Sequence, residues 1–342
     1  MEDEIVDIAK GLAIILMVIG HSGCPTLLHD SIYLFHMPLF FFISGWTFKE
    51  KYLDDKFTYF VNRLKRLYGT FVVYGLMFLL FHNLFSFLNF YNPPIEAYTE
   101  QQFFQQAIKV ITFRGSDQLL GGFWFLKVLF FSSLLCLMSL YVVNKIPIIK
   151  SRYLGKWTIA FGFLIATLIA TLTGIETKYF VAAALFMAGS IVREHWCIIH
   201  VKWYPLLLPL VFLLVVAAYL KPLSMFGLTS PLLIIYYLSV AFLGIFISLL
   251  LSQLVIKQRN IKNALVYIGK NTMLILVWHM LSFKLVSLIK LWQYELPIKA
   301  LGQFPVIAAN NVFYWVPYSI GGVFLPIWFI LIQRKILSEK QN

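Results

Sequence analysis

Apolar residues form long runs along the chain, and short polar segments separate them. An α-helix needs about 20 such residues to cross the hydrocarbon core of a bilayer, and most of the runs approach that length. The predicted spans are residues 5–22, 32–48, 67–89, 123–144, 157–174, 179–192, 203–220, 231–253, 272–289 and 311–333. The pattern therefore predicts an all-α, polytopic transmembrane helical bundle of about ten spans, forming a single integral-membrane domain over residues 1–342.

The distribution of basic residues indicates how these spans are oriented. With the N-terminus inside, the inner segments hold nineteen Lys and Arg residues and the outer segments hold six. Basic residues concentrate on the cytoplasmic side of membrane proteins, so both termini are predicted to be cytoplasmic. The N-terminus, MEDEIVDIAKGL, lacks a basic region before its apolar run. We therefore expect that run to be a retained span rather than a signal peptide.

Composition agrees with membrane insertion and argues against a nucleic-acid partner and a metal site. The 342 residues are 60% hydrophobic and 13% charged, and the formal net charge is +13. Most of that charge lies in the inner segments, where anionic lipid is its natural partner, so no nucleic-acid partner is expected. The histidines are scattered and no HExxH spacing occurs, so no metal site is expected either.

The first span carries two ionisable residues that are energetically costly inside a bilayer, Lys10 and His21, with only uncharged residues between them. On a helix their eleven-residue separation returns to within about 20° of the same face and spans about 16 Å. Asp7 lies three residues before Lys10, where a salt bridge can form. Ionisable groups at membrane depth usually mark function, so this helix is the leading candidate for a site.

Other polar groups fall inside predicted spans. His36 is expected at a depth comparable to that of His21, and Pro38 is expected to free a backbone carbonyl on the same helix. His279 lies about halfway along the ninth span, while Lys284 is nearer the outer surface and is expected to snorkel. Each residue also has a structural explanation, since a membrane histidine often bonds a neighbouring helix.

The inner segment before the third span ends in a basic run. On a continuing helix Arg63 and Arg66 stand one turn apart and form a fork suited to phosphate oxygens, with Lys65 adding charge. The alternative is the positive-inside rule with snorkelling at a helix start.

The longest outer segment, residues 90–122, contains the polar stretch TEQQFFQQ and leads to Trp124. We expect a short amphipathic helix here, either contacting an acceptor or serving as an interfacial connector. Trp124 is a candidate for stacking on a sugar ring, although aromatic belts select the same residue.

At these residues the chain resembles the acyltransferase 3 family of bacterial integral-membrane acyltransferases. The family pattern of Arg or Lys, ten residues and then His matches Lys10 and His21, although many members have Arg at the first position. The other matching motifs are Phe35-His36-Met37-Pro38 with the run to Gly45, Arg63-Leu64-Lys65-Arg66, Phe123-Trp124-Phe125-Leu126, Gly269-Lys270-Asn271-Thr272 and Trp278-His279.

The resemblance implies acyl transfer, most often of acetyl, from cytoplasmic acyl-CoA to a hydroxyl of a saccharide or lipid-linked glycan at the outer face. It also implies a bacterial cytoplasmic (inner) membrane location, with acetyl-CoA as the donor substrate. The expected site residues are His21 as general base, Asp7 and Lys10 as its catalytic partners toward the donor, Arg63, Lys65 and Arg66 on the donor phosphates, and His36, Trp124 and His279 on the acceptor or oxyanion.

Two alternatives use the same residues differently. In a transporter or flippase for a glycan or anionic small molecule, the intramembrane His and Lys residues serve a proton relay or bind the substrate. In a structural membrane protein they only join helices.

Overall fold

The protein is built from α-helices. The computed structural model describes residues 2–93, 95–146, 152–196 and 201–339, and these contain helices and loops but no strand. The predicted all-α fold class is therefore confirmed. The main helices are α1 (Glu2–His21), α2 (Thr26–Tyr33), α3 (His36–Trp46), α4 (Lys56–Arg63), α5 (Thr70–Leu80), α6 (His82–Phe87), α7 (Glu100–Ile111), α8 (Trp124–Val143), α9 (Arg152–Thr173), α10 (Lys178–Glu194), α11 (Leu207–Leu220), α12 (Pro231–Val255), α13 (Arg259–Lys270), α14 (Thr272–Gln293) and α15 (Trp315–Glu339).

Several helices have the length and composition of membrane spans. Within the described ranges, five segments qualify, namely Thr26–Trp46, Gln118–Val143, Tyr153–Thr173, Pro231–Val255 and Thr272–Gln293. Two shorter apolar helices, Tyr204–Leu220 and Trp315–Phe329, coincide with further predicted spans. The chain is thus a multi-pass membrane protein, while the total of ten spans and the orientation of the termini stay predictions.

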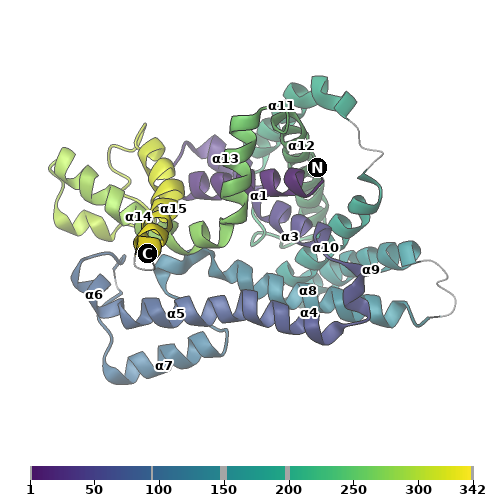
Figure 1. Cartoon of the computed structure of the whole chain (residues 1–342), viewed down its shortest axis with the longest axis horizontal. Helices are drawn as coiled ribbons and strands as arrows, with labels where there is room; N and C mark the ends of the chain where they lie inside the picture. Colours follow the sequence, from purple (N-terminus) through teal and green to yellow (C-terminus); the bar gives the residue numbers. More distant parts are fainter. Residues whose placement is uncertain (1, 94, 147–151, 197–200, 340–342) are drawn as a thin grey trace. The chain divides into compact units, whose positions relative to one another are not determined.

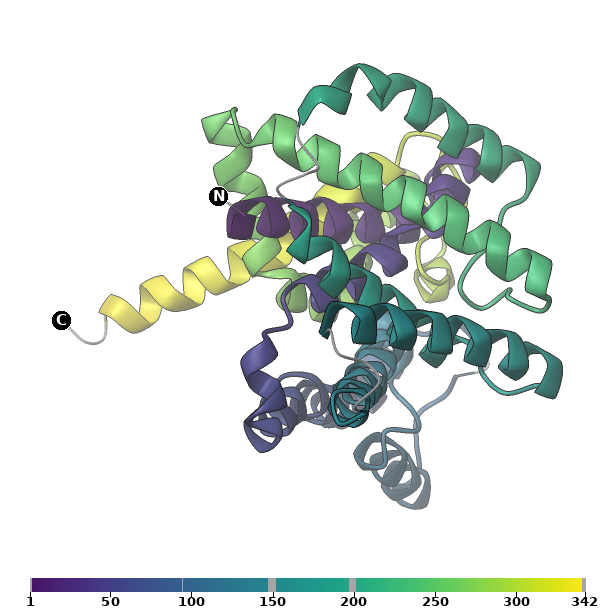
Figure 2. The same ribbon diagram turned by 90° about the vertical axis from the view of Figure 1, so that its right-hand side faces the viewer.

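The helices form two compact units that share α1. The first comprises Met1–Ala13, Asp30–Leu67 and Phe125–Lys270, and the second comprises Ile14–His29, Tyr68–Trp124 and Asn271–Asn342. In the first unit α9 lies beside α10 (Figure 1), and α11 lies along α12 (Figure 2). In the second unit α14 packs on α15, and α7 packs on α5 (Figure 1).

The second predicted span is interrupted before Pro38. Helix α2 ends at Tyr33 and α3 begins at His36, so Pro38 lies in the first turn of α3. Amide groups in a first turn have no intrahelical acceptor, and proline therefore breaks no bond there. The expectation that Pro38 frees a carbonyl within a continuous helix is wrong for this reason.

Glycines allow α3 and α10 to approach closely within the first unit. A Cβ atom on Gly45 would collide with the carbonyl oxygen of Phe186, and one on Gly189 would collide with the carbonyl oxygen of Phe42. The contact is reciprocal, since each helix contributes a glycine against the other's backbone. Small residues at such crossings are a common device for helix association in membranes.

We expect Gly189→Ala to lower the free energy of unfolding by about 1–3 kcal/mol, because the added methyl must push the two backbones apart. Thermal unfolding in detergent measures the change. The matched control is Gly162→Ala on the exposed side of α9, where nothing lies within 4 Å of the new Cβ. Equal melting temperatures for the two variants would contradict the close-packed crossing.

Candidate active site

The N-terminal half of α1 carries an ion pair in the first unit. The Lys10 ammonium donates to the Asp7 carboxylate at 3.1 Å, and both side chains are partly exposed. Helix α13 crosses α1 at this point, because Gly11 lies against the backbone of Leu265 and Gly269 lies against that of Asp7. The predicted pairing of Asp7 with Lys10 is thus present, on a stretch of helix whose position is fixed by its crossing with α13.

A second ion pair joins the same two helices. The Lys262 ammonium donates to the Glu4 carboxylate at 2.9 Å, and this hydrogen bond lowers the pKa of Glu4. This ion pair and the close contact at Gly269 both hold α13 against α1. Sequence reasoning quoted Gly269 as part of a motif but gave it no role.

The basic run of the first unit differs from the expected α-helix. Helix α4 ends at Arg63 and residues Leu64–Gly69 form a π-helix. A π-helix closes its turns with i→i+5 bonds, so three residues cover less of a turn than in an α-helix. Arg63 and Arg66 therefore do not stand one α-helical turn apart.

Arg63, Lys65 and Arg66 have different surroundings. The Arg63 guanidinium lies over the rings of Tyr59 at 5.0 Å and Phe186 at 6.0 Å. Lys65 and Arg66 are exposed. The aromatic contacts fix Arg63 by cation–π attraction, whereas Lys65 and Arg66 remain accessible to a charged ligand.

His36 begins α3 and is buried in the first unit. Its Nδ1 donates to the carbonyl of Ile32 at 2.8 Å, and its ring meets the edge of Tyr33 at 5.0 Å. The hydrogen bond to the Ile32 carbonyl fixes the His36 ring at the break between α2 and α3. The expected convergence of His36 with His21 stays a prediction.

His21 and His279 come together in the second unit. His21 is the last residue of α1, and its ring centroid lies 5.6 Å from that of His279 on α14. His279 is fully buried, while His21 is partly exposed. Two imidazoles, one accessible and one enclosed, therefore share one location, although 258 positions separate them in the sequence.

Backbone contacts fix the tautomer of His279. Its Nδ1 lies 3.1 Å from the carbonyl oxygen of Ile275 and 3.0 Å from that of Leu276. Carbonyl oxygens only accept, so we assign the proton to Nδ1 and a lone pair to Nε2. That Nε2 is buried and has no hydrogen-bond partner among the described residues. A buried acceptor without a partner is costly, so a donor that reached Nε2 would be stabilised there.

The segment before Trp124 packs on α14 close to His279. It forms the short helix η3 (Gln118–Phe123), in which a Cβ on Gly122 would meet Leu276 and one on Gly121 would contact Met280. Leu276 and Met280 lie on either side of His279 in the sequence. Trp124, the first residue of α8, is partly exposed and belongs to the same unit as the histidine pair.

The segment 90–122, predicted to lie on the outer side, contains two helices among its described residues, α7 and η3. The predicted amphipathic helix is confirmed as α7, which begins with a capping box of Thr99 and Gln102. Asp117 accepts a 2.6 Å hydrogen bond from the Tyr91 hydroxyl and caps η3 through the amide of Leu119. Burial, and then the Asp117 carboxylate, raises the pKa of Tyr91. This network ties Tyr91 to η3, the helix that precedes Trp124.

Two buried lysines on α14 hold the loop that leads to α15. The Lys284 ammonium donates to the carbonyls of Leu301 at 2.8 Å and Gln303 at 2.7 Å, and Lys284 is fully buried. Lys290, also fully buried, donates to the carbonyl of Ile307 at 2.9 Å. The expectation that Lys284 snorkels is wrong, because loop carbonyls reach into the protein to meet it.

The same loop contacts the turn that follows His21. The Asn311 amide donates to the carbonyl of Gly23 at 2.7 Å. The loop is therefore held by α14 on one side and by the end of α1 on the other. Sequence reasoning missed this element, although two basic residues within one apolar helix, with no acidic residue in that helix, were a usable signal.

We expect Lys284→Met to lower the free energy of unfolding by about 1–3 kcal/mol, because two buried carbonyls lose their donor. Hydrogen exchange of residues 298–311 should accelerate at the same time. Lys299→Met, on the exposed surface of the loop, is the control and should leave both measurements unchanged. Unaltered exchange in Lys284→Met would contradict the anchoring role.

Within the described residues, no group of three His, Cys, Asp or Glu side chains is arranged to hold a metal ion.

Comparison with known proteins identifies the family to which the chain belongs. No curated protein and no solved structure matches the chain. The acyltransferase 3 family, described as an acyltransferase domain, matches residues 3–331. Because the match covers nearly the whole chain, this protein belongs to the acyltransferase 3 family of membrane acyltransferases.

Proposed function

We propose that the protein transfers an acyl group, which we assign as acetyl, from cytoplasmic acyl-CoA to a hydroxyl of an acceptor at the outer face of a bacterial inner membrane. The acceptor is a saccharide or a lipid-linked glycan. The observation that carries the proposal is the arrangement of α1. One continuous helix holds the Asp7–Lys10 ion pair near its start and ends at the His21–His279 pair. We assign donor binding to the first part of this helix and proton transfer to its last residue.

The distance along α1 suits the donor. Eleven residues of α-helix between Lys10 and His21 rise about 16 Å, which an extended pantetheine arm can follow. Lys10, held by Asp7, offers its charge to polar groups of the donor. Arg63, Lys65 and Arg66 are assigned to the nucleotide phosphates, where guanidinium and ammonium groups are the usual partners.

His21 is assigned as the general base. Its imidazole removes the proton from the acceptor hydroxyl as that oxygen attacks the thioester carbonyl carbon. The carbon–sulfur bond then breaks, and the imidazolium gives this proton to the CoA thiolate, which becomes the free thiol. The new ester remains on the acceptor, and the CoA thiol departs.

His279 is assigned to the acceptor rather than to the oxyanion. In its Nδ1–H tautomer the Nε2 atom accepts a hydrogen bond and cannot donate one to a developing oxyanion. A second hydroxyl of a saccharide is a suitable donor to this atom while the reacting hydroxyl meets His21. His36 and Trp124 are assigned as further acceptor contacts, with Trp124 stacking on a sugar ring.

We expect His279→Phe to lower kcat/KM for the acceptor about 3- to 10-fold, because one hydrogen bond to a hydroxyl is lost while the ring is kept. His279→Gln, which retains an acceptor oxygen, should recover part of the loss. Steady-state kinetics at saturating donor separate the two variants. If His279→Gln were as impaired as His279→Phe, the acceptor role of Nε2 would be contradicted.

The acyl group and its carrier are tested together by mass spectrometry of surface glycans from cells with and without the gene. We expect the glycan of cells with the gene to be heavier by an acetyl or related acyl group. Purified protein should also consume acetyl-CoA when a glycan is present. Glycan transport into liposomes without acyl-CoA, together with unaltered glycan masses, would favour a transporter instead.

A further inference from the structure

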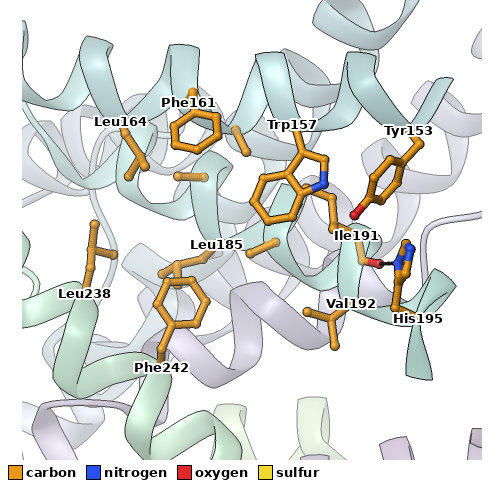
Figure 3. Close-up of a pocket in the computed structure, with 13 residues that line it drawn as sticks. Tyr153, Trp157, Phe161, Leu164, Leu185, Ile191, Val192, His195, Leu238 and Phe242 are labelled. Atoms are coloured by element: carbon orange, nitrogen blue, oxygen red, sulfur yellow. Dashed lines mark hydrogen bonds between the residues drawn. The ribbon is translucent and has the colours of Figure 1, made fainter. Parts of the chain in front are cut away.

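An apolar pocket lies among α9, α10 and α12 in the first unit, and the proposed acyl transfer does not use it. Its volume is about 400 Å³. Figure 3 shows the aromatic rings of Trp157 and Phe161 on one side and that of Phe242 on another. Three alanines, Ala160, Ala184 and Ala188, complete the hollow, because their short side chains leave space that larger residues would fill.

The pocket opens on the surface of these helices. Phe161 is 57% exposed and Phe242 is 40% exposed, so the rim is itself apolar. Both residues lie in helices that are long and apolar enough to cross a membrane. In a membrane protein an exposed apolar rim at such a position faces hydrocarbon rather than water.

Polar groups occur at only one end of the pocket. Tyr153, the indole of Trp157 and His195 lie there, whereas Leu164 and Leu238 line the other end (Figure 3). The Tyr153 and His195 rings are 4.7 Å apart, and His195 donates from Nδ1 to the carbonyl of Ile191 at 3.2 Å. Tyrosine and tryptophan with one apolar and one polar edge are typical of the level of lipid headgroups.

From these observations we infer that the pocket binds one acyl chain of a membrane phospholipid, with the headgroup at Tyr153, Trp157 and His195. The volume lies near the lower limit of small-molecule pockets, which span about 300–1,000 Å³, so a hydrocarbon chain fits better than a helix of another protein. The one-sided polarity matches a molecule that has a polar head and an apolar tail. A soluble ligand would need polar groups along the wall.

Photolabelling tests this inference on the full chain. The purified protein is placed in vesicles of phosphatidylethanolamine and phosphatidylglycerol that contain a phospholipid with a photoreactive diazirine in its acyl chain. We expect the labelled peptides to concentrate in α9, α10 and α12 around Phe161, Leu185 and Phe242. Ala188→Trp fills the hollow and should lower that labelling about tenfold.

The control is Ile165→Trp, which adds the same ring to the exposed side of α9 outside the pocket. Its labelling should equal that of the unmodified protein. Ala188→Leu gives the same comparison with a smaller loss if the tryptophan variant does not fold. Labelling that is unaffected by both substitutions at Ala188, or a crosslink between two copies through Trp157→Cys, would overturn the inference.

Discussion

Replacing His21 with alanine should lower acyl transfer about 10²- to 10⁴-fold, the range that a positioned general base contributes. The loss is expected in kcat, because the imidazole acts on the proton of the attacking hydroxyl and does not bind the donor. Transfer of labelled acetyl from acetyl-CoA to the glycan acceptor measures it. The melting temperature should change little, since His21 is partly exposed at the end of α1.

The matched control is His29→Ala, which removes a histidine from α2 in the same unit. It should retain the activity of the unmodified protein. Full activity in His21→Ala would exclude this histidine as the base.

Replacing Lys10 with methionine should raise KM for the acyl-CoA donor about 10- to 100-fold and leave kcat nearly unchanged. A hydrogen bond to a charged group contributes about 1.5–3 kcal/mol, and each 1.4 kcal/mol corresponds to a tenfold change. Lys10→Arg should remain active, because it keeps the charge beside Asp7. Initial rates over a range of acetyl-CoA concentrations give both constants.

Lys262→Met is the control for this prediction. It breaks the Glu4–Lys262 ion pair on the same part of α1 and α13, so it tests whether any loss of charge there affects the donor. An ion pair at the surface is screened by solvent and adds little to stability, so the donor KM should not change. An equal rise in KM for Lys10→Met and Lys262→Met would mean that Lys10 acts only through the structure.

The hydrophobic pattern predicted the helices well and their interruptions poorly. Runs such as 231–253 and 272–289 form α12 and α14. In lipid a single apolar segment can satisfy all its backbone hydrogen bonds only as an α-helix. The break between Tyr33 and His36 and the π-helix at Leu64–Gly69 have no comparable signal. They depend on local packing, which a one-dimensional pattern does not contain.

The candidate site shows the same division. The Asp7–Lys10 pair and its distance from His21 follow from helix geometry alone, so they could be predicted. The tautomer of His279 depends on the carbonyls of Ile275 and Leu276, and the burial of Lys284 depends on a loop seventeen or more residues away. Partners of that kind arise from tertiary structure, and sequence reasoning placed Lys284 at the membrane surface for lack of them.

Transfer across a sealed membrane tests the central proposal, that one helix joins a cytoplasmic donor to an outer acceptor. Proteoliposomes with a single protein orientation are supplied with acetyl-labelled CoA on the side of the N-terminus and with glycan acceptor on the opposite side. We predict that the label appears on the glycan although the two substrates never share a compartment, and that His21→Ala abolishes it. Label transferred only when donor and acceptor are on the same side would contradict the proposal.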